Sequence, residues 1–330
     1  LLASSAASDV YKRQILTDVE ILPKSVLFWR SFTHWIGGMG VLVFILCLLP
    51  LTGGYHMNLM KAESPGPSVS KLVPKVQSTA KILYTIYIIL TIVEIIFLLI
   101  GKMPLFDTLC LSFGTAGTGG FGIKNDSIAS YSTYNQVVIT VFMILFGINF
   151  NAYYLLLTKK VMQAAKNEEV RYYLGIIGLA IVAIAINTRE MFTSFGRAFQ
   201  QAAFQVGSII TTTGYATTDF NVWPVFSKTI LVILMFVGAC AGSTGGGIKV
   251  SRLLILCKSA RKELQLYLHP NAVKKIKMDD KAIPHEVVRA TNMFLFVYIM
   301  IFVTSLLIIS LDNLDMAVSY THLTLPTKLE

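Results

Sequence analysis

The sequence predicts an all-α integral membrane protein made of repeated units, each a spanning helix, a re-entrant short helix with its loop, and a second spanning helix. Three observations predict this class. Of the 330 residues, 54% are hydrophobic and only 14% are charged, whereas an average soluble domain is about 25% charged. Lysine and arginine gather in alternate loops between apolar segments. Two of the intervening loops carry a short apolar stretch that runs into threonine and glycine.

Six segments are apolar enough to be membrane spans, which need about 20 residues each. They run over residues 25–49, 81–100, 135–157, 171–186, 227–257 and 291–310. The fourth is short, and the fifth is interrupted in its middle by GACAGSTGGG. Because each segment is apolar on nearly every side, periodicity does not orient it.

The basic residues orient these spans. Loops 51–81, 158–171 and 257–290 are rich in lysine and arginine, while loops 101–134 and 187–226 hold two such residues each. Because basic loops stay on the cytoplasmic side, the first three are predicted to be cytoplasmic and the other two to face out. The net charge of +10 therefore reflects topology and contact with membrane lipid, and we expect no binding of nucleic acid.

The two outward loops have the pattern of re-entrant pore loops. Each begins with a helix-compatible stretch too short to cross a bilayer, about 105–112 behind Pro104 in the first and about 192–208 in the second. Small, hydroxyl and glycine residues follow, and then a polar extended run. Irregular backbone at membrane depth must be buried in protein or line water.

The order span, short helix, Thr-Gly loop, span therefore occurs twice, and both copies have the same orientation. The predicted parts are the second half of repeat 1 (15–50), repeat 2 (51–157), repeat 3 (158–257), and a cytoplasmic loop with the first helix of repeat 4 (258–317). Residues 1–14 and 318–330 resemble translated sequencing-adapter sequence, and we expect them to be non-native. With two of four loops expected elsewhere, the chain by itself is not expected to close a pore.

The Thr-Gly loops are the candidate ion-binding site. Their residues are Gly117, Thr118, Gly119, Thr212, Thr213 and Gly214. Gly119 and Gly214 permit backbone angles that a β-carbon opposes, so that carbonyl groups can replace the water around a monovalent cation. Because a dehydrated divalent ion needs carboxylates, loops without Asp or Glu favour K⁺; Asp126 and Asp219, downstream, would attract cations to the mouth. The alternative is that Thr-Gly is ordinary turn chemistry.

The interruption of the fifth span is the candidate gate. It centres on Gly242, Ser243, Thr244, Gly245, Gly246 and Gly247. Each interior glycine costs about 1 kcal/mol relative to alanine, so the helix should break here and its loop should obstruct a conduit beneath Thr213. Close helix packing through small residues is the alternative. Lys249 and Arg252 either snorkel to cytoplasmic headgroups or place positive charge near the conduit.

Other polar residues in the spans have two interpretations. Glu94 is either a functional ionisable group or a protonated, hydrogen-bonded one. His34, near the outer end of the first span, is expected to be an interfacial or helix-contact residue, with a proton relay as the alternative. Asn149 is expected to bond between helices.

The residues do not indicate an enzyme, because no nucleophile–base pair and no cluster of His, Cys and Asp stands out. GSTGGGIK differs from a P-loop because Ile248, not lysine, follows Gly247. GTGGFG has the glycine spacing of a dinucleotide-binding motif, but no predicted strand precedes it. Neither motif therefore predicts phosphate binding. The cysteines Cys47, Cys110, Cys240 and Cys257 lack metal-ligand spacing and are expected to be reduced packing residues. We expect no cofactor, and no metal other than K⁺ at the Thr-Gly loops.

Four motifs occur in an order that resembles one family. They are RSFTHWIGGMGVLVFILCLLP (30–50), FGTAGTGGFG (113–122), TTTGYAT (211–217) and GACAGSTGGGIKV (238–250). Over about residues 15–315 the chain resembles the TrkH/TrkG/KtrB potassium-uptake proteins. The resemblance implies the M1–P–M2 units of the potassium-channel-like superfamily of K⁺ transporters, four of them around one pore.

The resemblance also implies roles and partners. Gly117, Thr118, Gly119, Thr212, Thr213 and Gly214 would line the selectivity filter, and Gly242–Gly247 would form the intramembrane gating loop. The family works as a homodimer on a cytosolic, nucleotide-binding regulatory ring of the TrkA/KtrA type, which the basic inner loops could contact.

The predicted function is therefore K⁺ translocation by the pore-forming subunit of a Trk/Ktr-type uptake system in the cell inner membrane of a bacterium or archaeon. Channel-like flow and symport with H⁺ or Na⁺ both fit this prediction. The alternative is a secondary transporter with discontinuous helices for another cation or a small organic substrate. That alternative expects inverted repeats, whereas the repeats here run in parallel.

Overall fold

The computed structural model describes residues 19–38, 40, 76–269, 275–279 and 281–310. The expected adapter-like ends, residues 39 and 41–49 of the first span, and most of loop 51–81 lie outside the described residues. In chain order the helices are α2 (Lys24–Gly38), α5 (Val76–Ile100), α6 (Leu105–Ala116), α7 (Thr133–Phe146), α8 (Phe150–Leu157), α9 (Val161–Ala165), α10 (Glu168–Asn187), α11 (Phe195–Ile210), α12 (Val225–Val237), α13 (Val250–Leu268) and α14 (His285–Ser310). Short 3-10 turns η1 (Arg189–Met191) and η2 (Phe220–Val222) and a minimal antiparallel hairpin, β1 (Lys277–Met278) with β2 (Lys281–Ala282), complete the described part.

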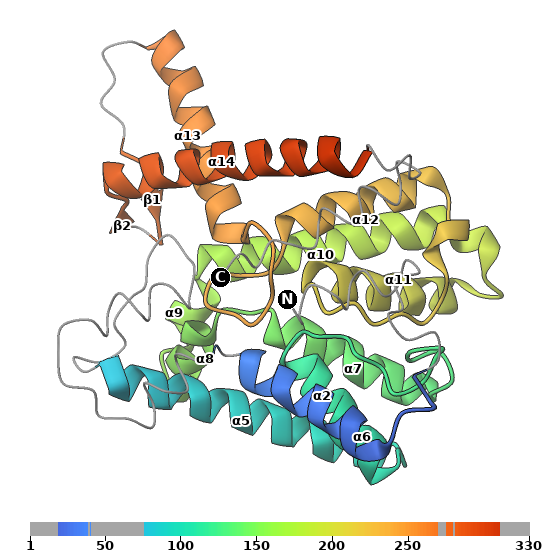
Figure 1. The fold of residues 1–330 in the computed structure, drawn as a ribbon. Helices are drawn as coiled ribbons and strands as arrows, with labels where there is room; N and C mark the ends of the chain where they lie inside the picture. The colour runs from blue at the N-terminus through green and yellow to red at the C-terminus, as the bar shows by residue number, and fades with distance from the viewer. Residues whose placement is uncertain (1–18, 39, 41–75, 270–274, 280, 311–330) are drawn as a thin grey trace.

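The helices form two groups that meet along one line (Figure 1). In the first group α6 packs against α2, α5 and α7, and α8 packs against α5. In the second group α11 packs between α10 and α12. Contact between α7 and α11 joins the groups, while α14 lies across α13 at one edge. The predicted all-α class is confirmed, and in chain order one long apolar helix is followed by two shorter helices in α5–α6–α7 and again in α10–α11–α12.

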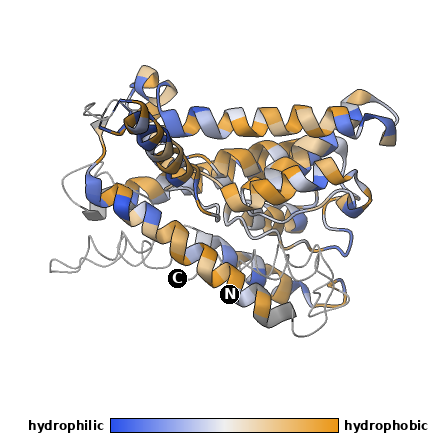
Figure 2. Ribbon diagram, turned by 90° about the horizontal axis from the view of Figure 1, so that it is seen from above, coloured by the Kyte–Doolittle hydropathy of each residue, from blue (hydrophilic) through white to orange (hydrophobic). Residues whose placement is uncertain are grey.

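The outer surfaces of the long helices are apolar, as expected for a protein in lipid. Helix segments Lys81–Ile100, Glu168–Asn187 and His285–Ser305 are each long and apolar enough to cross a membrane. Figure 2 shows hydrophobic residues along the helices and hydrophilic ones mainly at their ends and in the connecting segments. Ile92, Leu179 and Phe296 are among the many large side chains exposed on these helices. Lipid rather than water is the environment that favours such exposure.

The loops group on two sides as the basic residues predicted. At one end the backbone N–H of Glu168 donates to Asp279 (2.8 Å), which joins loops 158–171 and 257–290. At the other end the N–H of Ile128 donates to the carbonyl of Ala216 (3.1 Å), which joins loops 101–134 and 187–226. The members of each pair therefore lie on the same side of the helices.

The third predicted span was wrong as a single helix. Residues 135–157 are divided between α7 and α8, whose axes differ by 91°. Gly147 ends α7, and the Asn149 side chain caps α8 by accepting from the N–H of Asn151 (2.9 Å). The carbonyl of Gly147 accepts from the N–H of Cys240 (3.0 Å), in the interruption of the fifth span. A contact from a distant segment thus stabilises the bend.

The remaining boundaries differ from prediction for local reasons. Helix α6 continues past the predicted end at residue 112, to Ala116. Gly114 does not end the helix, because the following turn keeps its backbone hydrogen bonds: the N–H of Gly117 donates to the carbonyl of Phe113 (3.0 Å). Helix α10 begins earlier than predicted because Asn167 caps it (3.1 Å to the N–H of Val170). The fifth span breaks between α12 and α13, as predicted.

Candidate functional site

The segments after α6 and α11, called here the first Thr-Gly loop (residues 117–122) and the second Thr-Gly loop (211–216), have the same backbone conformation. The N–H of Gly119 bonds to the carbonyl of Gly114, and the N–H of Thr213 bonds to that of Ser208, both at 2.8 Å. Equivalent left-handed φ angles are 53° at Thr118 and 57° at Thr212, and 66° at Gly120 and 92° at Gly214. Two segments that differ in sequence therefore repeat one geometry, which an ordinary turn does not require.

This register corrects one prediction. The sequence paired Gly119 with Gly214 as the residues with glycine-only backbone angles, but the left-handed partner of Gly214 is Gly120. A β-carbon on Gly119 would instead lie 1.9 Å from the ring of His34. Gly119 is therefore required for space and Gly120 for backbone conformation.

The two Thr-Gly loops are in contact. A β-carbon on Gly120 would lie 2.0 Å from the carbonyl oxygen of Thr213. Further out, the hydroxyl of Tyr215 donates to the carbonyl of Leu111 (3.0 Å). Asp126 and Asp219 are exposed downstream, on the outer side of both loops. The structure thus brings together the two Thr-Gly loops, which are nearly a hundred residues apart in the sequence.

Helix α2 braces the first Thr-Gly loop, a role that the sequence did not predict. His34 is buried and packs edge-on against Phe121, with ring centroids 5.1 Å apart. The guanidinium of Arg30 lies 4.9 Å from the same ring and donates to the carbonyl of Gly122. A β-carbon on Gly117 would lie 2.6 Å from the carbonyl of His34. The spacing of Arg30 and His34, one helical turn apart, was the available signal.

The break in the fifth span is a closed loop, called here the central loop (residues 238–249). Its ends pair through backbone bonds: the N–H of Lys249 donates to the carbonyl of Val237, and the N–H of Val250 to that of Ala239, both at 3.1 Å. Gly238 and Gly247 have φ of 69° and 84°, and a β-carbon on Gly247 would lie 2.5 Å from the α-carbon of Gly238. Glycine at both positions lets the two backbone segments that close the loop lie this near to each other.

The central loop lies directly against the Thr-Gly loops. The hydroxyl of Thr118 donates to the carbonyl of Thr244 (2.9 Å), and the N–H of Gly246 donates to the hydroxyl of Thr212 (2.7 Å). A β-carbon on Gly245 would lie 3.0 Å from the carbonyl oxygen of Thr211. The equivalent threonines of the two Thr-Gly loops therefore both hold the central loop, one as donor and one as acceptor.

The other predicted site residues make local contacts. The hydroxyl of Thr213 shares a hydrogen bond with that of Thr211 (2.7 Å), and the hydroxyl of Ser243 donates to the carbonyl of Cys240 (2.7 Å). The carbonyl of Gly242 accepts from the N–H of Phe150 (3.0 Å). All twelve predicted filter and gating residues thus lie in one connected region.

Lys249 does not reach the lipid headgroups, so that interpretation was wrong for this residue. Its side chain is buried, and its ammonium donates to the carbonyl of Gly245 within the central loop. Arg252 lies between the central loop and α14: its guanidinium lies 4.0 Å from the ring centroid of Phe294 and donates to the carbonyl of Ile248 (3.4 Å). Both basic side chains therefore contact the central loop, and of the two only Lys249 is buried.

Glu94 is fully buried in α5, with the hydroxyl group of Thr115 near its carboxyl group. Within the described residues neither carboxyl oxygen of Glu94 makes a hydrogen bond. Across the same ranges no three His, Cys, Asp or Glu side chains come close enough to hold a metal ion. The Thr-Gly loops themselves, residues 117–122 and 211–216, contain no Asp or Glu.

Proteins of similar sequence include named cation and potassium transport proteins. A family described as TrkH, cation transport protein, matches residues 3–321. The Trk system potassium uptake protein TrkH of Salmonella typhimurium is 34% identical over 305 residues, which are 91% of this chain and 63% of that protein. The TrkH of Vibrio parahaemolyticus is 37% identical over 309 residues, 91% of this chain and 64% of that protein.

A solved structure is similar throughout. The crystal structure of the potassium transporter TrkH from Vibrio parahaemolyticus has a TM-score of 0.80 and 32% sequence identity, covering 97% of this chain and 68% of that one. The chain thus spans a little under two thirds of the length of its curated relatives. The sequence match over nearly all of the chain and the shared fold lead to one conclusion: this chain belongs to the TrkH family of cation transport proteins.

Proposed function

We propose that this chain is the central part of a K⁺-translocating membrane subunit. The observation that carries the proposal is the pair of Thr-Gly loops, which repeat one left-handed backbone pattern, touch each other, and contain no carboxylate. Carbonyl oxygens of pore loops can replace the hydration shell of a monovalent cation. Relatives named as potassium uptake proteins support K⁺ as that cation.

In this proposal Gly117–Gly119 and Thr212–Gly214 form two of the filter segments, and a complete pore uses two further segments from repeats 1 and 4. The C-terminal ends of α6 and α11 direct partial negative charge toward the ion. The central loop, held by Thr118 and Thr212, obstructs the path on the inner side. Loops 51–81, 158–171 and 257–290 face the cytoplasm.

The function is tested by uptake of Rb⁺, a K⁺ substitute, in a bacterial strain that lacks its own K⁺ uptake systems. We expect the complete gene that encodes this chain to restore growth at low K⁺ and to import Rb⁺ in preference to Na⁺. Import of an organic solute without Rb⁺ uptake, by protein present in the membrane at normal amounts, would overturn the proposal.

The contact between Gly119 and His34 predicts a rescue. A β-carbon in Gly119→Ala meets the imidazole at 1.9 Å, so the loop must shift and the preference for Rb⁺ over Na⁺ should fall. In the double variant with His34→Ala the ring is absent, and we expect part of the preference to return. Ion preference is measured as the ratio of Rb⁺ to Na⁺ uptake. A double variant no better than Gly119→Ala would argue against this contact as the cause.

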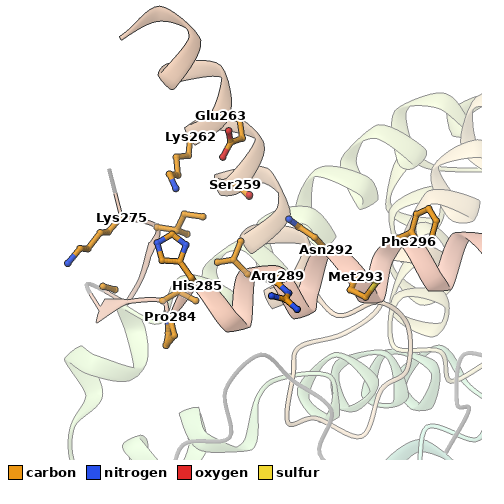
Figure 3. Close-up of a pocket in the computed structure, with 14 residues that line it drawn as sticks. Ser259, Lys262, Glu263, Lys275, Pro284, His285, Arg289, Asn292, Met293 and Phe296 are labelled. Atoms are coloured by element: carbon orange, nitrogen blue, oxygen red, sulfur yellow. The ribbon is translucent and has the colours of Figure 1, made fainter. Parts of the chain in front are cut away.

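We further propose that the complete protein is a homodimer on a cytosolic, nucleotide-binding subunit of the TrkA/KtrA type. A cavity of about 730 Å³ lies between α13, the β1–β2 hairpin and α14, on the predicted cytoplasmic side (Figure 3). Its lining holds three basic side chains, Lys262, Lys275 and Arg289, and one acidic side chain, Glu263, with His285 beside them. This net positive lining supports contact with an acidic face of the regulatory subunit.

A further inference from the structure

Glu169 is a buried carboxylate that connects the central loop to the rest of the protein. It is the second residue of α10, and its side chain is 4% exposed. One carboxylate oxygen accepts from the backbone N–H of Ala241 (2.6 Å) and from that of Ser251 (3.2 Å). The other oxygen accepts from the side-chain amide of Asn149 (3.2 Å). Three segments distant in the sequence therefore meet at one side chain.

The two backbone N–H groups that Glu169 binds lie on either side of most of the central loop. Ala241 lies in its first half, and Ser251 is the second residue of α13, directly after the loop. The N–H groups in the first turn of a helix have no partner within the helix, so the carboxylate supplies one for Ser251. Glu169 thereby joins the N-terminal half of the central loop to the first turn of α13.

The third partner anchors the same loop to the bend between α7 and α8. The side-chain oxygen of Asn149 caps α8, while its amide binds Glu169. The next residue, Phe150, donates its N–H to the carbonyl of Gly242 in the central loop (3.0 Å). The carboxylate is thus part of a network that fixes the loop from two sides.

Charge adds to the hydrogen bonds. Lys249, buried at the inner end of the central loop, has its ammonium on the carbonyl of Gly245 and interacts electrostatically with Glu169. A buried charge is strongly unfavourable when its partner is removed. The positions of the carboxylate and of the loop are therefore coupled.

We propose that Glu169 is a positioning residue that holds the central loop beneath the Thr-Gly loops. The inference rests on the proposed role of that loop as a gate, which it deepens by naming the anchor. Replacing the carboxylate with the amide of glutamine removes the charge and one of the two acceptor oxygens, so at least one buried donor loses its partner; a buried donor that loses a charged partner shifts a local equilibrium by about tenfold or more. The loop should then leave its position more often.

The test measures the position of the loop directly. A reporter cysteine, Ser243→Cys, is placed in the complete protein after Cys47 and the exposed Cys257 are changed to serine, and its reaction with a water-soluble maleimide is timed. We expect Glu169→Gln to raise the reaction rate about tenfold and Glu169→Asp, which keeps the charge, to raise it less. Rb⁺ uptake by the same variants is measured in parallel.

The neighbouring residue offers a matched control. Glu168 is 30% exposed and pairs with Lys258 at the surface, so Glu168→Gln removes a charge one residue away without touching the central loop. Its reaction rate should equal that of the reference protein. Equal rates for Glu169→Gln and the reference would overturn the inference.

Two further outcomes are distinguishable. Faster reaction in Glu169→Gln with unchanged Rb⁺ uptake would uphold the anchor and count against the loop as a gate. If Glu169→Gln is not recovered from the membrane in folded form, Asn149→Ala removes the bond to one carboxylate oxygen and leaves the other in place. We expect about a threefold rise in reaction rate for that variant, and no rise would overturn the inference.

Discussion

Replacing Gly120 with alanine is expected to remove most of the discrimination between K⁺ and Na⁺ in the complete protein. A β-carbon there would lie 2.0 Å from the carbonyl oxygen of Thr213 and 3.0 Å from the carbonyl carbon of Gly214, so the two Thr-Gly loops must separate. The left-handed φ of 66° adds strain for any residue with a side chain. Wider spacing of the carbonyl oxygens favours ions that keep part of their water.

We expect the ratio of Rb⁺ to Na⁺ uptake to fall by about tenfold, the factor that corresponds to about 1.4 kcal/mol. Gly178→Ala is the matched control, because a β-carbon at Gly178 in α10 would have nothing within 4 Å and alanine favours the helix. An uptake ratio for Gly120→Ala equal to that of Gly178→Ala would refute the assignment of these loops as filter segments.

Deleting residues 242–247 is expected to raise the rate of Rb⁺ uptake. This part of the central loop lies directly against Thr118 and Thr212 on the inner side, where it would obstruct an ion that leaves the Thr-Gly loops. The backbone hydrogen bonds that pair the ends of the loop, from Lys249 to Val237 and from Val250 to Ala239, lie outside the deleted segment. The α12–α13 connection can therefore close without it.

We expect uptake to rise about tenfold, as for a barrier lowered by about 1.4 kcal/mol. Ion preference should change less than uptake, because the carbonyl oxygens of the Thr-Gly loops remain. If the segment serves close helix packing instead, its loss should lower the thermal stability of the purified protein and leave uptake unchanged or reduced. Size-exclusion profile and thermal stability in detergent separate these results.

The membrane spans and the break between α12 and α13 could be predicted because their signals are local. Residues 81–100 are mostly apolar, and they lie in α5 as predicted. Gly238, Gly242 and Gly247 adopt left-handed φ between 68° and 84°, which a helix cannot contain. Composition alone therefore located both features.

The bend between α7 and α8 was not predicted, because its local signals, Gly147 and the capping residue Asn149, are weak within an apolar run. A single glycine is tolerated inside a helix. The bend is stabilised by Cys240 and Glu169, which contact it from other parts of the chain. Distant partners of this kind leave no pattern at the bend itself.

By itself the amino-acid sequence determined the all-α class, the presence of two Thr-Gly loops, and the family to which the chain belongs, since these depend on residue type and order. Only the tertiary structure decided that Gly120 rather than Gly119 has the left-handed conformation, that His34 braces the first loop, and that Glu169 anchors the central loop. Each of these depends on a contact with a distant residue: Glu169 and Ala241 are 72 positions apart. Burial makes such contacts strong, because a polar group away from water must find its partner within the protein.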